Sequence, residues 1–292
     1  MVKNYFKLLR VPQWIKNFFV FVPLVFSQHL FEKDYFLMVM AGFALFCLSS
    51  SIVYIFNDII DVQRDKLHPV KKFRPIASGN ISKPNAFIIA FSLILITGIS
   101  LTRFNPGFAI AVLSYVLLNI FYSFSFKHVV LLDIFSIAAG FILRVVAGGL
   151  IINVMISSWL LLTTMFISLF LAVIKRQSEL KLTNEDANFT TRKVLSLYSL
   201  EFTKQIAAIT SSGVIVCYAL YTVSARTVSI FGTENLIYTT PFVVFGIFRY
   251  MFIADRSSKG ENTTEIMLTD LPLIINILLY SMVVTLIVYK II

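Results

Sequence analysis

Charged residues are scarce in this chain. Asp, Glu, Lys and Arg make up 14% of its 292 residues, whereas hydrophobic residues make up 58%. Soluble domains have about 25% charged and about 45–50% apolar residues. The composition therefore excludes an ordinary soluble domain and indicates a membrane protein with several spans. The net charge of +10 does not indicate a nucleic-acid partner, because the basic residues lie between apolar runs, as in membrane proteins.

Cysteine and histidine are also rare. Cys47 and Cys217 lie alone within apolar runs, which excludes a disulfide framework and a cysteine-type metal site. The three histidines are scattered, so no histidine-based metal site is indicated. The sequence contains no glycine-rich nucleotide-binding loop, low-complexity segment or clear repeat.

Nine apolar runs follow one another along the chain. They cover residues 15–31, 35–56, 86–101, 107–124, 131–151, 157–174, 206–224, 236–254 and 271–290. Most are long enough for a helix to cross a bilayer. No small-residue cleavage site follows the first run, which is therefore predicted to be a retained span. Residues 1–14 are predicted to form an amphipathic segment at the membrane surface.

Basic residues are unequally divided between the two sides of the predicted spans. The amino-terminal segment and the loops after spans two, four, six and eight hold 19 Lys or Arg, whereas the opposite side holds 4. Cytoplasmic segments of membrane proteins carry an excess of Lys and Arg. We therefore expect a multi-pass protein of the cell inner (plasma) membrane, with a cytoplasmic amino terminus and an outside carboxyl terminus. The long loops 57–85 and 175–205 would then be cytoplasmic.

A charged stretch at the end of the second apolar run is the candidate metal–phosphate site. Asp58, Asp61 and Asp65 are three and four residues apart, a spacing that predicts one helical face. Crowded carboxylates raise one another's pKa, and Mg²⁺ relieves that repulsion while joining carboxylates to substrate phosphates. A mixed, solvated helix end is the alternative interpretation. The neighbouring polar and basic residues, which suit a polyanionic ligand, are Asn57, Lys66, Lys71, Lys72 and Arg74.

Two further groups are candidates for binding an anion. Tyr122, Lys127 and His128 end the fourth run, where a snorkelling lysine beside an interfacial tyrosine is the alternative. Arg144 lies within the fifth run on the same predicted helical face as Asp133. An intramembrane arginine normally faces a bundle interior or a wet cavity. A buried ion pair between two helices is the alternative for this residue.

The sixth apolar run ends in a third charged group. Lys175 and Glu179 are four residues apart, so a helix-end ion pair is one interpretation of Lys175, Arg176 and Glu179. Binding of substrate phosphates by the two cations is the other. Arg249, in the eighth run, lies near the cytoplasmic end of its span and could snorkel.

The pattern Asn57-Asp58-x-x-Asp61-x-x-x-Asp65, at the end of the second of nine runs, resembles the UbiA-type intramembrane prenyltransferase superfamily. The resemblance covers nearly the whole chain, and the nine runs and the Tyr122 and Lys127 pair fit it. It implies an all-α polytopic membrane protein, a single domain of residues 1–292. Nine transmembrane helices would surround a central cavity open to lipid and to the cytoplasm. The aspartates would bind a pyrophosphate through Mg²⁺.

The chain departs from this superfamily at one place. Prenyltransferases usually carry a second aspartate-rich motif after the sixth span, where this chain has Lys175-Arg176-x-x-Glu179. The cations there argue for an additional negatively charged group in the cavity. In this departure, and in residues 12–17, 68–75 and 127–128, the chain resembles the branch of polyprenyl-phosphate phosphoribosyltransferases.

That resemblance implies transfer of 5-phosphoribose from 5-phosphoribosyl 1-pyrophosphate to a polyprenyl phosphate, with release of pyrophosphate and Mg²⁺ as cofactor. No strong general base is needed, because the lipid phosphate is already ionised. The expected catalytic residues are Asp58, Asp61, Asp65, Lys175 and Arg176, the aspartates also holding the metal. The expected phosphate-binding residues are Lys16, Asn57, Lys71, Lys72, Arg74, Tyr122, Lys127, His128 and Arg144.

Two alternatives to this function stay open. The first is an ordinary prenyltransferase that moves a prenyl group from its pyrophosphate to an aromatic or quinone precursor. The absence of the second aspartate motif argues against it. The second is a membrane transporter, which would be expected to show paired broken helices and internal repeats. The sequence shows neither.

Overall fold

The computed structural model describes residues 2–68, 70–185, 193–256 and 269–291. Over these ranges the chain is helical, with no strand, and eight helices are long and apolar enough to cross a membrane. The candidate spans lie in α3 (Lys33–Ile60), α5 (Lys83–Leu101), α6 (Pro106–Phe124), α7 (Leu132–Ile151), α8 (Ser158–Glu185), α9 (Leu200–Val223), α11 (Thr240–Arg256, preceded by η5, Asn235–Thr239) and α13 (Leu271–Val288). The all-α prediction is confirmed.

The first apolar run forms a shorter element than predicted. After α1 (Val2–Leu8), the 3₁₀ helix η1 (Val11–Phe21) leads into α2 (Val22–Phe26), so the apolar helical segment ends before residue 31. η1 lies very close to α7 at Gly148, where an added Cβ would be 2.1 Å from the carbonyl oxygen of Val20. Glycine is therefore required at this contact.

Two predicted loops contain more helix than expected. α3 continues through Asn57 to Ile60 and is followed by α4 (Val62–Leu67) and η2 (Lys71–Phe73), all within or overlapping the predicted loop 57–85. α8 continues to Glu185, so Lys175 and Arg176 lie in a helix and not in the predicted loop 175–205. α3 and α8 each extend beyond their apolar runs, because polar side chains in the last turns, such as Asp58 and Arg176, are buried and paired inside the bundle.

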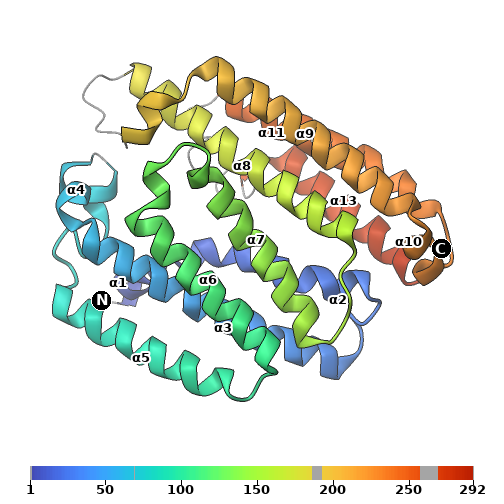
Figure 1. Ribbon diagram of the computed structural model, residues 1–292, viewed down its shortest axis with the longest axis horizontal. Coiled ribbons are helices and arrows are strands. Elements are labelled where there is room, and N and C mark those ends of the chain that lie inside the picture. Colours follow the sequence, from blue (N-terminus) through green and yellow to red (C-terminus); the bar gives the residue numbers. More distant parts are fainter. Residues whose placement is uncertain (1, 69, 186–192, 257–268, 292) are drawn as a thin grey trace.

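The helices form a bundle in which the two chain ends lie far apart (Figure 1). α5 and α6 each pack on α3, α7 packs between α6 and α8, and α8 packs along α9. The amino terminus and α4 lie at one end, and α10 (Ala225–Phe231) and the carboxyl terminus lie at the other (Figure 1).

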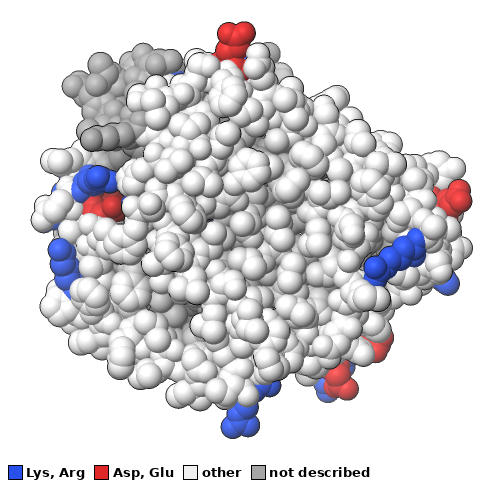
Figure 2. Space-filling view, viewed as in Figure 1, with Lys and Arg blue, Asp and Glu red and all other residues white. Residues whose placement is uncertain are grey.

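One broad face of the molecule has the charge distribution expected of a lipid-facing surface. In Figure 2 the Lys, Arg, Asp and Glu side chains lie around the rim, and the broad centre of this face carries none. Charges within the hydrocarbon region are costly, so an uncharged belt fits burial in a bilayer.

Candidate active site

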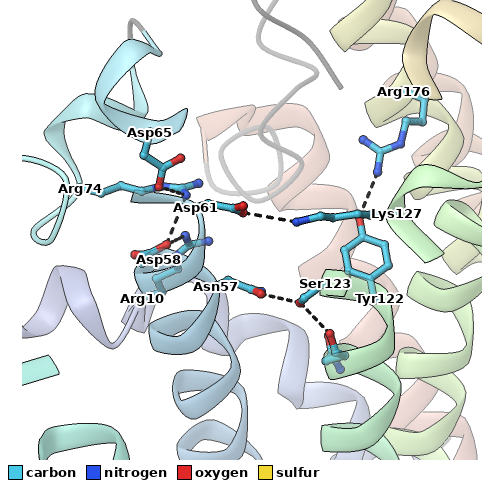
Figure 3. Close-up of polar contacts among 11 residues, drawn as sticks. Arg10, Asn57, Asp58, Asp61, Asp65, Arg74, Tyr122, Ser123, Lys127 and Arg176 are labelled. Carbon is cyan, nitrogen blue, oxygen red and sulfur yellow. Dashed lines mark hydrogen bonds and ion pairs between the residues drawn. The ribbon is translucent and has the colours of Figure 1, made fainter. Parts of the chain in front are cut away.

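The junction between α3 and α4 positions the aspartates. α3 ends at Ile60, α4 begins at Val62, and Asp61 between them has φ −86° and ψ 6°, outside the α-helical region. Because the helix is interrupted there, Asp61 points away from Asp58 and Asp65 (Figure 3). The prediction that all three carboxylates share one helical face was therefore wrong for Asp61.

Asp58 and Asp65 converge on a pair of arginines. Arg74, which follows η2, donates from Nη1 to Asp65 Oδ2 across 2.7 Å and to Asp58 Oδ1 across 3.2 Å. Arg10, between α1 and η1, also pairs with Asp58 Oδ1, and its guanidinium lies 4.7 Å from the centre of the Tyr54 ring. Both carboxylates are buried. The amino-terminal segment and the α4–η2 segment thus meet at the end of α3.

The opposite wall of the site comes from the end of α6 and from η3 (Phe126–His128). Lys127 Nζ faces Asp61 Oδ2 at 3.5 Å. The single hydroxyl proton of Ser123 has two acceptors within hydrogen-bond distance of Oγ, Asn57 Oδ1 at 2.5 Å and the carbonyl oxygen of Asn119 at 2.7 Å. Figure 3 shows the Lys127–Asp61 and Ser123–Asn57 contacts running between α3 and the α6–η3 segment. The predicted Asn57, Asp61 and Lys127 therefore lie together.

These residues surround a cavity of about 340 Å³ with an excess of positive charge. Its lining contains five Lys or Arg side chains but only two Asp, with Asp58 adjoining them. A cavity of this charge suits a ligand with several phosphate groups. The charged and titratable side chains that line it are Arg10, Asp61, Arg64, Asp65, His68, Lys71, Arg74, Tyr122, Lys127 and His128.

His68 shapes the loop that carries the cations Lys71 and Arg74. Its Nδ1 accepts the backbone N–H groups of Val70, at 3.2 Å, and Lys71, at 3.3 Å. Burial, followed by the nearby positive charges of Lys71 and Arg74, lowers the pKa of His68. A neutral ring is needed to accept these two hydrogen bonds, so the electrostatic environment and the hydrogen bonding agree.

Arg176 is held in an ion-pair network behind the cavity. It is 1% exposed, donates from Nε to Asp133 Oδ2 at 2.6 Å, and pairs with Glu179. Its remaining terminal nitrogen donates to the Tyr122 hydroxyl at 3.3 Å (Figure 3). Tyr198 donates to the other oxygen of Asp133 at 2.7 Å, and burial, then this bond, raises the pKa of Tyr198. Arg176 does not line the cavity itself, but it is hydrogen-bonded to Tyr122, which does.

Arg144 lies deeper in the bundle and has neutral partners. It donates to Asn17 Oδ1 at 2.8 Å, to the carbonyl oxygen of Gly140 at 2.8 Å and to the Tyr115 hydroxyl at 2.9 Å. Arg144 and Asp133 are both buried, as their shared helical face predicted. Asp133, however, pairs with Arg176. Lys16, which was expected to bind phosphate, is partly buried on η1, the element that also carries Asn17.

Some of the expected site residues lie outside the cavity lining. They are Lys16, Asp58, Lys72, Arg144, Lys175 and Arg176. Lys72 is exposed, with Nζ 5.2 Å from the centre of the Phe73 ring. Five lining residues were not among the expected ones: Arg10, Arg64, Leu67, His68 and Ser123. Two of these had a signal in the sequence, since Arg10 precedes the 12–17 stretch and His68 begins the 68–75 stretch.

The three aspartates are candidate ligands for a divalent cation. Three Asp side chains are the hard oxygen donors that Mg²⁺ prefers. Asp58 Oδ2 is buried without a hydrogen-bond partner, which leaves one oxygen available. In the described ranges, however, no group of three His, Cys, Asp or Glu side chains is close enough to hold a metal ion. The donor set fits the metal, and in this structure Arg74 and Lys127 are the ion-pair partners of these carboxylates.

The sequence has relatives that match over most of its length. The decaprenyl-phosphate phosphoribosyltransferase of Mycolicibacterium smegmatis is 32% identical over 285 residues, covering 92% of this chain and 87% of the relative. The protein of the same name from Corynebacterium glutamicum is 33% identical over 271 residues, covering 90% of this chain and 80% of the relative.

The fold also has solved counterparts. A UbiA homolog from Archaeoglobus fulgidus, solved bound to GPP and Mg²⁺, matches with a TM-score of 0.71 and 18% identity, covering 98% of this chain and 99% of that one. At this identity the match shows the fold alone. The sequence pattern that defines the UbiA prenyltransferase family matches residues 18–269. The chain is therefore an integral multi-pass membrane protein and belongs to the UbiA prenyltransferase family.

Proposed function

We propose that this protein transfers 5-phosphoribose from 5-phosphoribosyl 1-pyrophosphate to a polyprenyl phosphate, and that the reaction depends on Mg²⁺. The observation that carries the proposal is the excess of cations around the cavity, five Lys or Arg against two Asp. The names of the relatives from Mycolicibacterium smegmatis and Corynebacterium glutamicum support the same reaction.

The charge of the proposed substrates matches this cavity. The donor carries a phosphate and a pyrophosphate, and the acceptor carries a lipid phosphate. Two such anions repel each other, and cations in a site shielded from water reduce that repulsion. An ordinary prenyltransferase binds one pyrophosphate and has less need of so many cations.

The reaction needs little acid–base chemistry from the protein. An oxygen of the lipid phosphate attacks carbon 1 of the ribose, the new C–O bond forms, and the bond from carbon 1 to the pyrophosphate oxygen breaks. Pyrophosphate leaves with the bonding electrons, and no proton has to move. Lys127 and Lys71, on different walls of the cavity, would bring the two phosphate-bearing groups together. This is catalysis by position and charge.

Asp58, Asp61 and Asp65 would hold the metal. Mg²⁺, when bound, would neutralise charge on the departing pyrophosphate. Arg74 now bridges Asp58 and Asp65, and Lys127 pairs with Asp61. Binding of a metal by these carboxylates would therefore compete with their ion pairs to Arg74 and Lys127. Released from the carboxylates, the same side chains are free to bind substrate phosphates.

Arg176 and Lys175 act differently in this proposal. Because Arg176 is buried and bonded to Asp133, Glu179 and Tyr122, we assign it to positioning the Tyr122 hydroxyl at the cavity wall. Lys175, half-buried on the same helix, is kept as a candidate phosphate contact. Arg144 and Lys16 would supply positive charge from beneath the cavity.

The test uses membranes that contain the protein. They are incubated with labelled 5-phosphoribosyl 1-pyrophosphate and a polyprenyl phosphate, and the lipids are extracted. Label should enter the lipid fraction only when both substrates and Mg²⁺ are present. A parallel incubation supplies a prenyl pyrophosphate and an aromatic acceptor. A prenylated aromatic product, together with no labelled lipid, would replace the proposal with the ordinary prenyltransferase reaction.

A further inference from the structure

The short segment between η3 and α7 contains a strained residue. Leu131 has φ 68° and ψ −40°, a backbone conformation that residues with a side chain rarely adopt. Its carbonyl oxygen accepts the backbone N–H groups of Ile134 and Phe135 in the first turn of α7. A strained backbone of this kind persists only where the surrounding structure holds it in place. The turn between η3 and α7 therefore depends on a contact that fixes Leu131.

That contact is made by the hydroxyl of Tyr198, which follows η4 (Lys193–Leu197). The backbone N–H of Leu131 donates to this hydroxyl at 2.8 Å. The single proton of the hydroxyl is donated to Asp133 Oδ1 at 2.7 Å, so its oxygen is left to accept from Leu131. The other oxygen of Asp133 is bonded to Arg176. The buried pair of Asp133 and Arg176 thus fixes the direction of the hydroxyl that holds the turn.

Apolar packing holds the ring of Tyr198 against the same turn. Tyr198 is 6% exposed and belongs to a buried cluster with Leu180 of α8 and with Val194 and Leu195 of η4. Val130, which lies in the turn, packs against this cluster. The hydroxyl is therefore presented to the turn by a well-packed ring that lies outside the lining of the polar cavity.

The turn is joined to the polar cavity by a short stretch of backbone. Lys127 lies in η3, four residues before Leu131, and lines the cavity with Nζ 3.5 Å from Asp61 Oδ2 (Figure 3). η3 has only three residues, which is too short for a helix to be stable without contacts from the rest of the fold. α6 fixes η3 at one end, and the turn at Leu131 fixes it at the other. The position of Lys127 therefore depends on the anchor at Leu131.

We infer that Tyr198 is a positioning residue, whose hydroxyl holds the turn at Leu131 and thereby keeps Lys127 at the mouth of the polar cavity. The role of Lys127 as a phosphate contact rests on the proposed function. Tyr198 does not line the cavity, so it acts only through the backbone that carries Lys127. The alternative is that Tyr198 only packs η4 against the bundle. Packing of that kind would depend on the ring and not on the hydroxyl.

Tyr198→Phe separates these two roles. It keeps the ring in the apolar cluster and removes the hydroxyl, which takes away the partner of the Leu131 N–H group and of one oxygen of Asp133. Tyr218→Phe is the matched control. Tyr218 is also buried, with its hydroxyl 2.5 Å from Thr239 Oγ1, but it lies near the carboxyl end of α9. A general cost of removing a buried tyrosine hydroxyl would appear in both variants.

The first measurement is transfer of labelled phosphoribose, normalised to folded protein. Tyr198→Phe should lower kcat/KM by about tenfold, because a displaced Lys127 loses a charge-assisted contact with phosphate. In a Lys127→Gln background no cation is left to position, so Tyr198→Phe should have no further effect. Tyr218→Phe should cause no loss in either background. Equal losses from Tyr198→Phe with and without Lys127 would overturn the inference.

The second measurement does not depend on turnover. Hydrogen exchange is followed in peptides that cover residues 126–132. The Leu131 amide should exchange about tenfold faster in Tyr198→Phe, whereas Tyr218→Phe should leave its exchange unchanged. Wild-type exchange in Tyr198→Phe would show that the hydroxyl does not hold the turn and would overturn the inference. If exchange is faster in Tyr198→Phe but the wild type transfers no phosphoribose, the proposed reaction fails and the anchoring of η3 by Tyr198 stands.

Discussion

Lys127 faces Asp61 across the mouth of the polar cavity, with 3.5 Å between Nζ and Oδ2. The contact joins the α3–α4 junction to η3 and puts a cation beside the most exposed of the three aspartates, which is 27% exposed. Asp58 and Asp65, by contrast, have almost fully buried side chains, and both pair with Arg74. Of the three aspartates, Asp61 can therefore be substituted with the least effect on the fold.

Asp61→Asn should lower turnover by about 100-fold or more, because a carboxylate that would hold Mg²⁺ is lost while the side-chain shape is kept. The amount of folded protein should stay near the wild-type level. Steady-state transfer of labelled phosphoribose, normalised to purified protein, measures the effect. Asp34→Asn is the control, since Asp34 is exposed in the first turn of the same helix at its other end. Wild-type turnover in Asp61→Asn would exclude Asp61 from metal binding.

Arg176→Gln should destabilise the protein by about 3–5 kcal/mol, because it leaves the fully buried Asp133 without its cation. Thermal unfolding in detergent measures the loss. Adding Asp133→Asn should recover part of that loss, since the double variant no longer buries an unpaired charge. If the stability losses of the two single variants simply add in the double variant, the broken ion pair is not the cause of the loss in Arg176→Gln.

Lys175 and Arg176 should also differ in kinetics. Lys175→Gln should raise the apparent substrate requirement or cut turnover by about tenfold while leaving stability near the wild-type value. Arg176→Gln should lower kcat with the stability loss described above, because Tyr122 loses its positioning bond. Tyr122→Phe should reproduce the kinetic part of that effect without the loss of stability. Wild-type kinetics in Lys175→Gln would remove Lys175 from the proposed site.

The sequence predicted the fold class correctly, and eight of the expected site residues line one cavity; the reasons are local. Long apolar runs identify spanning helices, and Asn57 and the aspartates mark the end of α3. Spacing assumes an unbroken helix, however, and the break at Asp61 turned one carboxylate toward Lys127. That change depends on how α4 and η2 fold back, which no local pattern encodes.

Partners far apart in the sequence were harder to predict. Arg10 was assigned to a surface segment, although it pairs with Asp58, 48 residues away. Arg176 was expected to bind phosphate because its charge replaces a carboxylate motif. Its partner Asp133 is 43 residues away, so the pair becomes visible only when α7 and α8 pack together.

The topology prediction can be tested with single cysteines. Ser78→Cys, in an exposed turn before α5, should react with a membrane-impermeant label only from the cytoplasmic side. Glu234→Cys, at the opposite end of the bundle, should react only from outside. Cys47 and Cys217 are buried and should give little background. Labelling of position 78 in sealed cells would reverse the predicted orientation.

Arg249 is paired with Asp270, the residue that caps α13, and the pair gives a pH-dependent contribution to stability. The hydrogen bond from Arg249 lowers the pKa of Asp270 below its ordinary value of 3.8. A carboxyl with a lowered pKa stabilises the fold above its unfolded-state pKa, and that stability is lost as the pH falls through the folded-state pKa. Asp270→Asn keeps a capping side chain but removes the charge. The melting-temperature difference between wild type and variant should therefore be small, constant near neutral pH, and absent once the pH falls below the lowered pKa of Asp270. A difference that grows on acidification would contradict this assignment.

The central claim, transfer of phosphoribose to a lipid phosphate, is tested most directly by product stoichiometry. Purified protein in lipid vesicles is given polyprenyl phosphate and 5-phosphoribosyl 1-pyrophosphate labelled in the 5-phosphate, with Mg²⁺ or with saturating chelator. The account predicts that labelled lipid and free pyrophosphate appear in equal amounts with Mg²⁺ and that neither forms in chelator. Pyrophosphate release without labelled lipid, or undiminished lipid labelling in chelator, would contradict it.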